Sequence, residues 1–349
     1  MAMEFYLFLP QMRMSFPQLV ERAQAAEKAG FGGITGMDHL APPLAEEHPM
    51  YEAMVTNTWL AGRTDRIRIG SLVLCDAFRH PAMLAREAVS LDHASQGRFD
   101  LGIGWGSVPS ELDTFGVGTT DAAARVARMK ETLEIVKALW AGETVDYEGE
   151  YFNLKQARQV PRPIGRIPIV IGGAGKKTMQ LVAAHADWWN IHVGILDKLD
   201  EVKDQAGDAR VSLQVQLAFV PDEVERDSII ATAHRRFGEL PVTGTGPELV
   251  EQFGALAERG VERCYVVQRF RPTFDACSVR RAGDQRDQRR LIDPDVKEFS
   301  PNDPELPGGR RRSCGLESSS STRWLGRGRK ERRRRLSRTL WIRSSWPIR

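Results

Sequence analysis

An aspartate and a histidine stand side by side at the end of a short apolar run, in the sequence GITGMDHL of residues 33–40. A histidine can donate or accept a proton near neutral pH, and a carboxylate can orient a neighbouring group. Because side chains alternate between the two faces of a strand, Asp38 and His39 should point in opposite directions and have different partners. The pair indicates a site for proton transfer or binding, although a lone histidine at such a place is more often structural.

Other apolar runs of the chain end in polar or glycine-rich residues in the same way. They end at Cys75-Asp76, at the GWGS of 104–107, at the GGAGKK of 172–177, and at Asn190 and His192. In a barrel of parallel strands the active site lies at the carboxyl ends of the strands, so these ends should converge on one face. Several such ends together favour a cofactor cleft over a set of unrelated structural residues.

The sequence IVIGGAGKKT of residues 169–178 is typical of a strand, a glycine turn and the start of a helix. Backbone N–H groups at such a turn attract an anion, and Lys176 and Lys177 add positive charge. The turn is not a Walker A loop, and GIGWGS (102–107) does not match the G-x-G-x-x-G of a Rossmann fold. The turn therefore predicts a phosphate site, with a tight turn of purely structural glycines as the alternative.

Short β-rich runs alternate with helical patterns over about the first 270 residues, which is the signature of parallel strands joined by helices. Eight such strands fit a TIM-like (β/α)8 barrel of the α/β class, with an open doubly wound sheet as the alternative. The strands are expected at 4–9, 33–37, 67–75, 99–104, 167–171, 188–192, 211–220 and 263–267. The helices are expected between Ser15 and Gly30 and at 50–63, 81–95, 121–140, 175–186, 222–237 and 247–259. Residues 141–166 predict an inserted hairpin after the fourth strand, where barrels often have a lid or a substrate wall.

The formal charge of +3 is divided unevenly along the 349 residues. Residues 271–349 contain 21 Lys and Arg against 10 Asp and Glu, whereas residues 1–270 contain 28 against 36. The basic end has neither helical nor strand period, so we expect a barrel domain at 1–270 and a disordered or non-native Arg/Ser-rich tail at 271–349. A frameshifted reading frame, a solvated basic tail, and an arm that binds nucleic acid or a membrane surface are the three interpretations of this tail.

Cysteine usage and the lengths of the apolar runs indicate a cytoplasmic protein. The four cysteines are scattered and form no C-x-x-C pair, so neither a disulfide framework nor a zinc site is expected. The first residues lack the basic region and long apolar core of a secretion signal, and nowhere do about 18 apolar residues follow one another. We expect no membrane span and no bound metal.

Three segments of the chain, taken in order, resemble the bacterial luciferase-like monooxygenases, a family of flavin- or deazaflavin-dependent oxidoreductases. The segments are FRHP (78–81), GRFDLGIGWG (97–106) and IGGAG followed by AHADWWN (171–190). The resemblance runs from residue 1 to about residue 270. It implies a TIM-like barrel with an insertion after the fourth strand, a homodimer, and a flavin or deazaflavin ring at the carboxyl ends of the strands.

The resemblance also implies roles for individual residues. By position, His39 would lie beside the reactive edge of the ring, and Asp38 would support the site from the same strand end. The bond between Leu72 and Val73 falls where members often have a cis peptide. The cofactor would be held by Leu72, Val73, Cys75, Gly104, Gly172, Gly173, Ala174, Gly175 and Lys176.

Members of the family that use coenzyme F420 transfer a hydride, whereas members that use reduced FMN activate dioxygen. The sequence GIGWGSVPSEL is closer to the F420-type reductases, so we expect hydride transfer between F420 and a small organic substrate. An FMN-dependent monooxygenase is the nearest alternative, and nucleic-acid binding through the basic tail is an alternative of another class. Ser107 stands where the family's sugar-phosphate dehydrogenases have an acidic residue, and Glu111 comes only later, which argues against a sugar-phosphate substrate.

Overall fold

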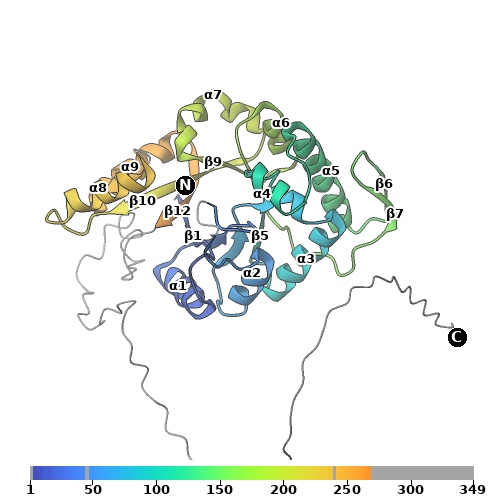
Figure 1. Cartoon of the computed structure of the whole chain (residues 1–349), viewed down its shortest axis with the longest axis horizontal. Helices are drawn as coiled ribbons and strands as arrows, with labels where there is room; N and C mark the ends of the chain where they lie inside the picture. The colour runs from blue at the N-terminus through green and yellow to red at the C-terminus, as the bar shows by residue number, and fades with distance from the viewer. Residues whose placement is uncertain (1–2, 44–46, 239–240, 269–349) are drawn as a thin grey trace, which may run out of the picture. The chain divides into compact units, whose positions relative to one another are not determined.

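Eight parallel strands form a closed barrel in the computed structural model, which describes residues 3–43, 47–238 and 241–268 (Figure 1). The pairing of β12 with β1 and of β9 with β10 closes the ring. In ring order the strands are β1 (Glu4–Phe8), β2 (Gly33–Gly36), β3 (Arg68–Ser71) continued by β4 (Leu74–Cys75), β5 (Phe99–Gly104), β8 (Ile169–Gly172), β9 (Trp188–His192), β10 (Arg210–Phe219) and β12 (Val261–Gln268). The predicted (β/α)8 barrel is confirmed, and its closure rules out the open sheet. The predicted tail at 271–349 lies outside the described residues.

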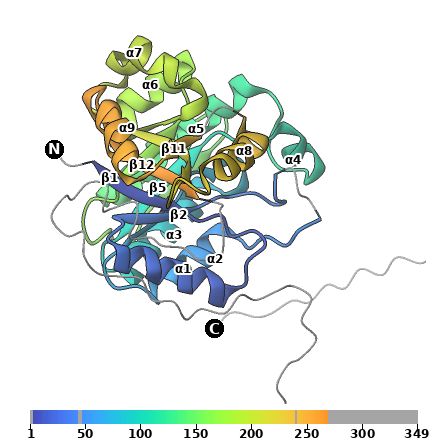
Figure 2. The same cartoon turned by 90° about the vertical axis from the view of Figure 1, so that its left-hand side faces the viewer.

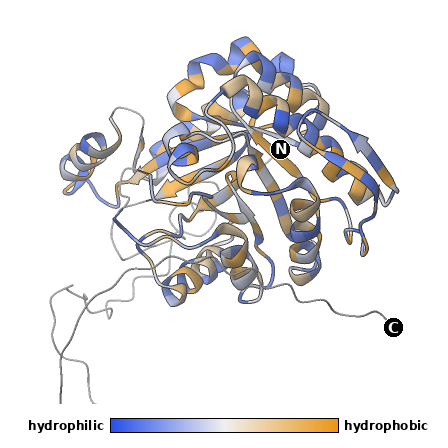
Figure 3. Ribbon diagram, turned by 45° about the vertical axis from the view of Figure 1, so that its right-hand side comes forward, coloured by the Kyte–Doolittle hydropathy of each residue, from blue (hydrophilic) through white to orange (hydrophobic). Residues whose placement is uncertain are grey.

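The barrel strands are apolar because they are covered on both faces. Strand β5 is buried along its whole length, and β9 is buried at all but its last residue. Parallel strands with helices outside and packed side chains inside have continuous apolar sequences, which is why these strands could be predicted. Figure 3 shows hydrophobic strands inside a layer of helices whose outer faces are largely hydrophilic.

The outer helices begin and end at residues suited to helix ends. Helix α1 (Phe16–Ala29) begins after Ser15, which forms a reciprocal capping pair with Gln18, and ends at Gly30 in the left-handed conformation with φ of 83°. The other predicted helices are found within a few residues of their expected bounds. They are α2 (Ala53–Ala61), α3 (Pro81–Ala94), α5 (Ala122–Ala141), α6 (Lys176–His185), α8 (Arg226–Phe237) and α9 (Gly246–Glu258).

Short elements between the barrel strands were not predicted. The helix α4 (Pro109–Thr114) follows β5, the helix α7 (Leu199–Val202) lies among 3-10 turns before β10, and β11 (Val242–Gly244) pairs with β10 outside the ring. In Figure 2, α4 lies at the end of the barrel toward which the strands run. None of the described helices is long and apolar enough to cross a membrane.

The predicted insertion is an antiparallel hairpin of β6 (Val145–Glu148) and β7 (Asn153–Ala157). The carboxylate of Glu131 on α5 holds its turn, because it accepts hydrogen bonds from the backbone N–H groups of residues 150–152 at 2.7 to 3.1 Å. Figure 1 places the hairpin on the outer side of α5. The hairpin is therefore confirmed, but it contributes no wall to the two cavities described below, as a lid would.

A buried arginine fills the barrel near the amino ends of the strands. The guanidinium of Arg263 lies over the rings of Trp188 and Tyr6, with centroid distances of 3.7 and 4.0 Å. It forms ion pairs with Glu4 at 2.7 Å and with Asp100 at 3.3 Å. A cation with this many partners is stable inside the barrel, so this end is a packed core and the opposite end remains for a site.

Candidate functional site

A cavity of about 400 Å³ lies at the carboxyl ends of the strands, within the range of pockets for small ligands. The ends of β2, β4, β5, β8 and β9 and the middle of β10 contribute to it, so the convergence expected from the sequence is confirmed. Eight of the predicted site residues line it, namely Asp38, His39, Leu72, Val73, Cys75, Gly104, Gly172 and Gly173. The other lining residues include Trp105, Ser107, Glu111, Leu112, Asn190, His192, Ile195 and Gln214.

His39 forms a carboxylate–imidazole pair with Glu111 of α4. The Nδ1–H of His39 donates to Oε2 of Glu111 at 2.9 Å. The other oxygen of Glu111 accepts the backbone N–H groups of Leu40 at 2.5 Å and Ala41 at 3.1 Å. Because an ionised carboxylate only accepts hydrogen bonds, the proton lies on Nδ1, and no described residue binds Nε2. The pair therefore leaves Nε2 of His39 free to exchange a proton with a molecule in the cavity.

Asp38 has different partners from His39, as predicted, although β2 ends at Gly36 and both residues follow the strand. Its Oδ2 accepts the backbone N–H of Cys75 at 2.8 Å and Nη1 of Arg79 at 2.5 Å, and its Oδ1 accepts Nη2 of Arg79 at 3.2 Å. Both carboxylate oxygens are thus engaged by the last residue of β4 and by Arg79, which follows it. Asp38 fixes the end of β2 to the end of β4 and has no oxygen free for chemistry.

The wall formed by β4 and β5 depends on glycine. The peptide bond between Leu72 and Val73 is cis, as the resemblance implied. A Cβ added at Gly104 would lie 2.6 Å from Cγ2 of Val73, so only glycine lets the two strands approach this closely. Burial raises the pKa of the Cys75 thiol to about 12, so this side chain presents a neutral sulfur to the cavity.

The glycine turn after β8 lies at the other side of the cavity. Gly172 and Gly173 line it, and a Cβ added at Gly172 would meet only a carbonyl oxygen at 3.9 Å. Helix α6 begins at Lys176, and Gly175 before it provides no side-chain cap, so the first N–H groups of the helix remain available to an anion. Ala174, Gly175 and Lys176 do not line the cavity themselves. Their role in phosphate binding stays a prediction.

Two important lining residues were missed in the sequence. Glu111 lies on a helix of only six residues that no periodicity reveals, although Pro109 is a typical first residue of a helix. Gln214 interrupts the apolar strand β10, and together with Gln216 it has the spacing of two residues that share one face. Such paired polar residues in an otherwise apolar strand were a usable signal for an inward-facing polar wall.

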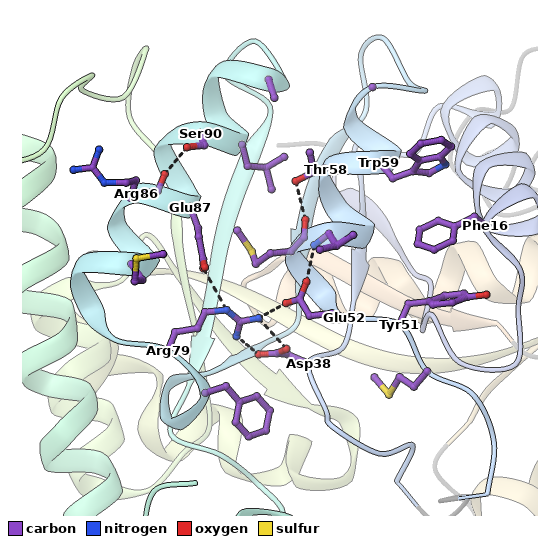
Figure 4. Close-up of a pocket in the computed structure, with 18 of the residues that line it drawn as sticks. Phe16, Asp38, Tyr51, Glu52, Thr58, Trp59, Arg79, Arg86, Glu87 and Ser90 are labelled. Carbon is purple, nitrogen blue, oxygen red and sulfur yellow. Dashed lines mark hydrogen bonds and ion pairs between the residues drawn. The ribbon is translucent and has the colours of Figure 1, made fainter. Parts of the chain in front are cut away.

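A second, larger cavity of about 1750 Å³ shares Asp38 and His39 with the first and lies against α1, α2 and α3. Arg79 is central to it, as Figure 4 shows. Besides Asp38, its guanidinium binds Glu52 at 2.5 Å and Glu87 at 3.4 Å. Burial raises the pKa of Glu87, opposed by the charge of Arg79. One arginine thus links the end of β2 to α2 and α3.

A family model described as luciferase-like monooxygenase matches residues 3–223. The chain belongs to the luciferase-like monooxygenase family. Among curated relatives, the chain is 32% identical to an F420-dependent glucose-6-phosphate dehydrogenase of Microbacterium testaceum, over 59% of this chain and 65% of the relative. It is 34% identical to the enzyme of the same name from Nakamurella multipartita, over 49% and 50% of the two chains. This luciferase-like chain therefore spans half to just under two thirds of the length of these relatives.

Solved structures of similar fold support the barrel assignment of this luciferase-like chain. An F420-dependent secondary alcohol dehydrogenase in complex with an F420-acetone adduct has a TM-score of 0.68 at 17% identity, covering 81% of this chain and 98% of its own. The monooxygenase RslO1 from Streptomyces bottropensis has a TM-score of 0.66 at 20% identity, covering 80% and 97%. At these identities the likeness extends to the fold alone.

Proposed function

We propose that this luciferase-like chain is an oxidoreductase that transfers a hydride between coenzyme F420 and a carbon of a small organic substrate. The observation that carries the proposal is the free Nε2 of His39, whose Nδ1 is bound by Glu111, in a cavity at the strand ends. The names of the two relatives, both F420-dependent dehydrogenases, support F420 as the cofactor.

The residues around the cavity fit such a cofactor. Its volume of about 400 Å³ and its apolar wall of Leu72, Val73 and Cys75 suit a flat ring, and Gly104 keeps that wall thin. The turn of residues 172–176 would hold the phosphate, because its glycines leave space and the uncapped N–H groups of α6 attract an anion. When bound, F420 supplies the carbon that gives or takes the hydride.

His39 would move the accompanying proton. For a carbonyl substrate, the imidazolium donates its Nε2 proton to the carbonyl oxygen as a hydride reaches the carbon, and the product is an alcohol. For an alcohol, neutral His39 takes the hydroxyl proton as the hydride leaves. Glu111 stabilises the imidazolium through the bond to Nδ1, and Asp38 keeps the end of β2 in place through Cys75 and Arg79.

Parallel titrations of F420 and FMN, followed by quenching of tryptophan fluorescence, test the cofactor. We expect F420 to bind more tightly. If FMN binds more tightly, and reduced FMN with oxygen supports turnover, the monooxygenase alternative replaces the proposal. If neither cofactor binds, the proposal fails.

Exchanging His39 for Ala tests the proton transfer. We expect turnover to fall by roughly 10²- to 10⁴-fold, the usual contribution of a general acid or base, with the Kd for F420 little changed. The measurement is the initial rate of F420 reduction or oxidation in a screen of alcohols and carbonyl compounds. Unchanged turnover would remove His39 from the mechanism.

Several features expected from the sequence remain proposals. We propose a homodimer in the cytoplasm with no nucleic-acid or membrane partner, and a barrel domain that ends near residue 270. Light scattering of the purified chain tests the dimer. Truncation at residue 275, combined with a salt titration of nucleic-acid binding, tests the alternative that the tail binds nucleic acid, because phosphate-driven binding falls steeply with salt.

A further inference from the structure

One wall of the site cavity is made of uncharged polar side chains. Asn190 and His192 come from β9 and Gln214 comes from β10, and all three line the cavity. In the register of the two strands, Gln214 lies beside His192. In the ring, β9 is four strands from β2, so this wall lies across the barrel mouth from His39. A molecule bound between them can contact both sides.

His192 is held in a neutral form. Its Nδ1 accepts the backbone N–H of Gly194 at 3.0 Å, so the proton of the neutral ring lies on Nε2. The amide nitrogen of Gln216 lies 2.9 Å from Nε2, and Oε1 of the same amide has no partner among the described residues, so turning the amide over lets Oε1 accept the Nε2–H. Burial lowers the pKa of His192, which also favours the neutral ring. Both ring nitrogens are thus occupied, and His192 presents an uncharged face to the cavity.

Gln214 is the polar group of this wall that remains available. It is half-buried, and its amide forms no hydrogen bond with any residue that the structure describes. The neighbouring Asn190 is different, because its Nδ2 donates to the hydroxyl of Ser212 at 3.3 Å. An amide that is partly removed from water and unpaired gains from a ligand that offers a hydroxyl or carbonyl group.

The charges beside His39 disfavour an anionic group on a substrate, in contrast to the glycine turn of residues 172–176, which is proposed to hold the cofactor phosphate. Its charged lining groups are the carboxylates of Asp38 and Glu111, and among the described residues no Lys or Arg lines it. Asp38 is neutralised by Arg79, but Glu111 has only the imidazole of His39 as a counter-charge. The buried Arg125 lies behind Trp105, 4.8 Å from its ring centroid, and donates to backbone carbonyl oxygens. A phosphate group of a substrate bound beside His39 would meet the carboxylate of Glu111 and no facing cation.

We propose that the substrate of this site is an uncharged small molecule with a hydroxyl or carbonyl group, and that Gln214 determines this specificity by hydrogen-bonding that substrate. The inference rests on the proposed function, and it separates this chain from relatives that are named for glucose 6-phosphate. The preference comes from the uncharged β9–β10 wall together with the carboxylate of Glu111.

Calorimetric titration of glucose 6-phosphate into the F420-loaded protein tests the charge argument. We expect the wild type to bind it with a Kd above about 1 mM, and Gln214→Lys to bind it at least tenfold more tightly because an ammonium group then faces the phosphate. Gln205→Lys is the matched control, since Gln205 is exposed and outside both cavities. A wild-type Kd below about 1 mM, or a Gln214→Lys variant no better than the control, overturns the inference.

Turnover tests the hydrogen bond. In a screen of alcohols, aldehydes, ketones and their phosphate esters, we expect the preferred compound to be uncharged and Gln214→Leu to lower its kcat/KM at least tenfold. A phosphate ester as the preferred compound, or an unchanged kcat/KM in Gln214→Leu, contradicts the inference. Binding of F420 is measured in the same samples. A protein that binds no F420 refutes the proposed function, whereas one that binds F420 and prefers a phosphate ester refutes only the specificity.

Discussion

Replacing Glu111 by Gln gives the sharpest test of the site, because it removes one charge and keeps the shape of the side chain. Oε1 of Glu111 accepts two backbone N–H groups, from Leu40 and Ala41, and Oε2 accepts Nδ1–H of His39 at 2.9 Å. The side chains of His39 and Glu111 are only 17% and 8% exposed, so water screens their interaction weakly. In Glu111→Gln the amide oxygen can keep the backbone contacts, but the amide nitrogen then faces Nδ1–H.

The size of the effect follows from the loss of a charge-assisted hydrogen bond. Such bonds contribute about 1.5 to 3 kcal/mol, compared with about 1 kcal/mol for a neutral bond. Since the imidazolium of His39 is the form that donates the proton, the loss raises the barrier for carbonyl reduction. At about 1.4 kcal/mol per tenfold change in rate, kcat should fall roughly 10- to 150-fold.

The assay is the steady-state rate of F420 oxidation with a carbonyl substrate, together with the Kd for F420 from tryptophan quenching. Asp113→Asn is the matched control, because Asp113 lies on the same short helix, is exposed, and makes the same change of charge. We expect the control to keep its kcat within about twofold, since exposed charges contribute little. If Glu111→Gln and Asp113→Asn have equal rates, Glu111 does not act on His39 and the reasoning is refuted.

Two further predictions concern stability. Arg79→Met leaves buried Asp38, half-buried Glu87 and exposed Glu52 without their shared cation. Because the charge of Asp38 is then buried without a partner, the free energy of unfolding should fall by roughly 3 to 5 kcal/mol in urea titrations. Exposed Arg86→Met should change it by less than about 0.5 kcal/mol, and equal losses would contradict the role of Arg79. The backbone N–H of Thr245, with Arg226 and the Thr245 hydroxyl, lowers the pKa of Glu248 from 4.5 to about 2. Its contribution is therefore present above pH 4.5 and lost as the pH falls toward 2, so the difference in Tm between wild type and Glu248→Gln should shrink on acidification in calorimetry, and a constant difference would contradict this.

The barrel could be predicted because its signals are local. The run WWNIH predicts β9 at residues 188–192 and the structure has it at the same residues, since a parallel strand buried on both faces is a short apolar run. The bounds of α1 were equally readable, because Ser15 and Gly30 act on the helix next to them. The order of the strands around the ring could not be read from the sequence, and the barrel was inferred from the number and alternation of the elements.

The partners of the site residues could not be predicted, because they come from distant parts of the chain. Glu111 is 72 residues from His39, and Arg79 is 41 residues from Asp38. Nothing in GITGMDHL indicates which carboxylate or cation the fold will bring to it. The inserted hairpin shows the same limit, since its sequence predicts two strands but its contact with Glu131, which places it outside the barrel, depends on tertiary packing.

The adjacent Asp38 and His39 differ in how completely their polar atoms are used, and this difference separates their roles. Asp38 has both oxygens bound by Cys75 and Arg79, so any proton transfer by it would first have to break a buried ion pair. His39 has one nitrogen bound and the other free, the state in which an imidazole is oriented and can still exchange a proton. The two neighbouring residues have different partners, so the first anchors the backbone from which the second acts. A substitution at Asp38 should therefore impair catalysis by moving His39. A further change that again fixes the end of β2 to the end of β4 should recover the activity.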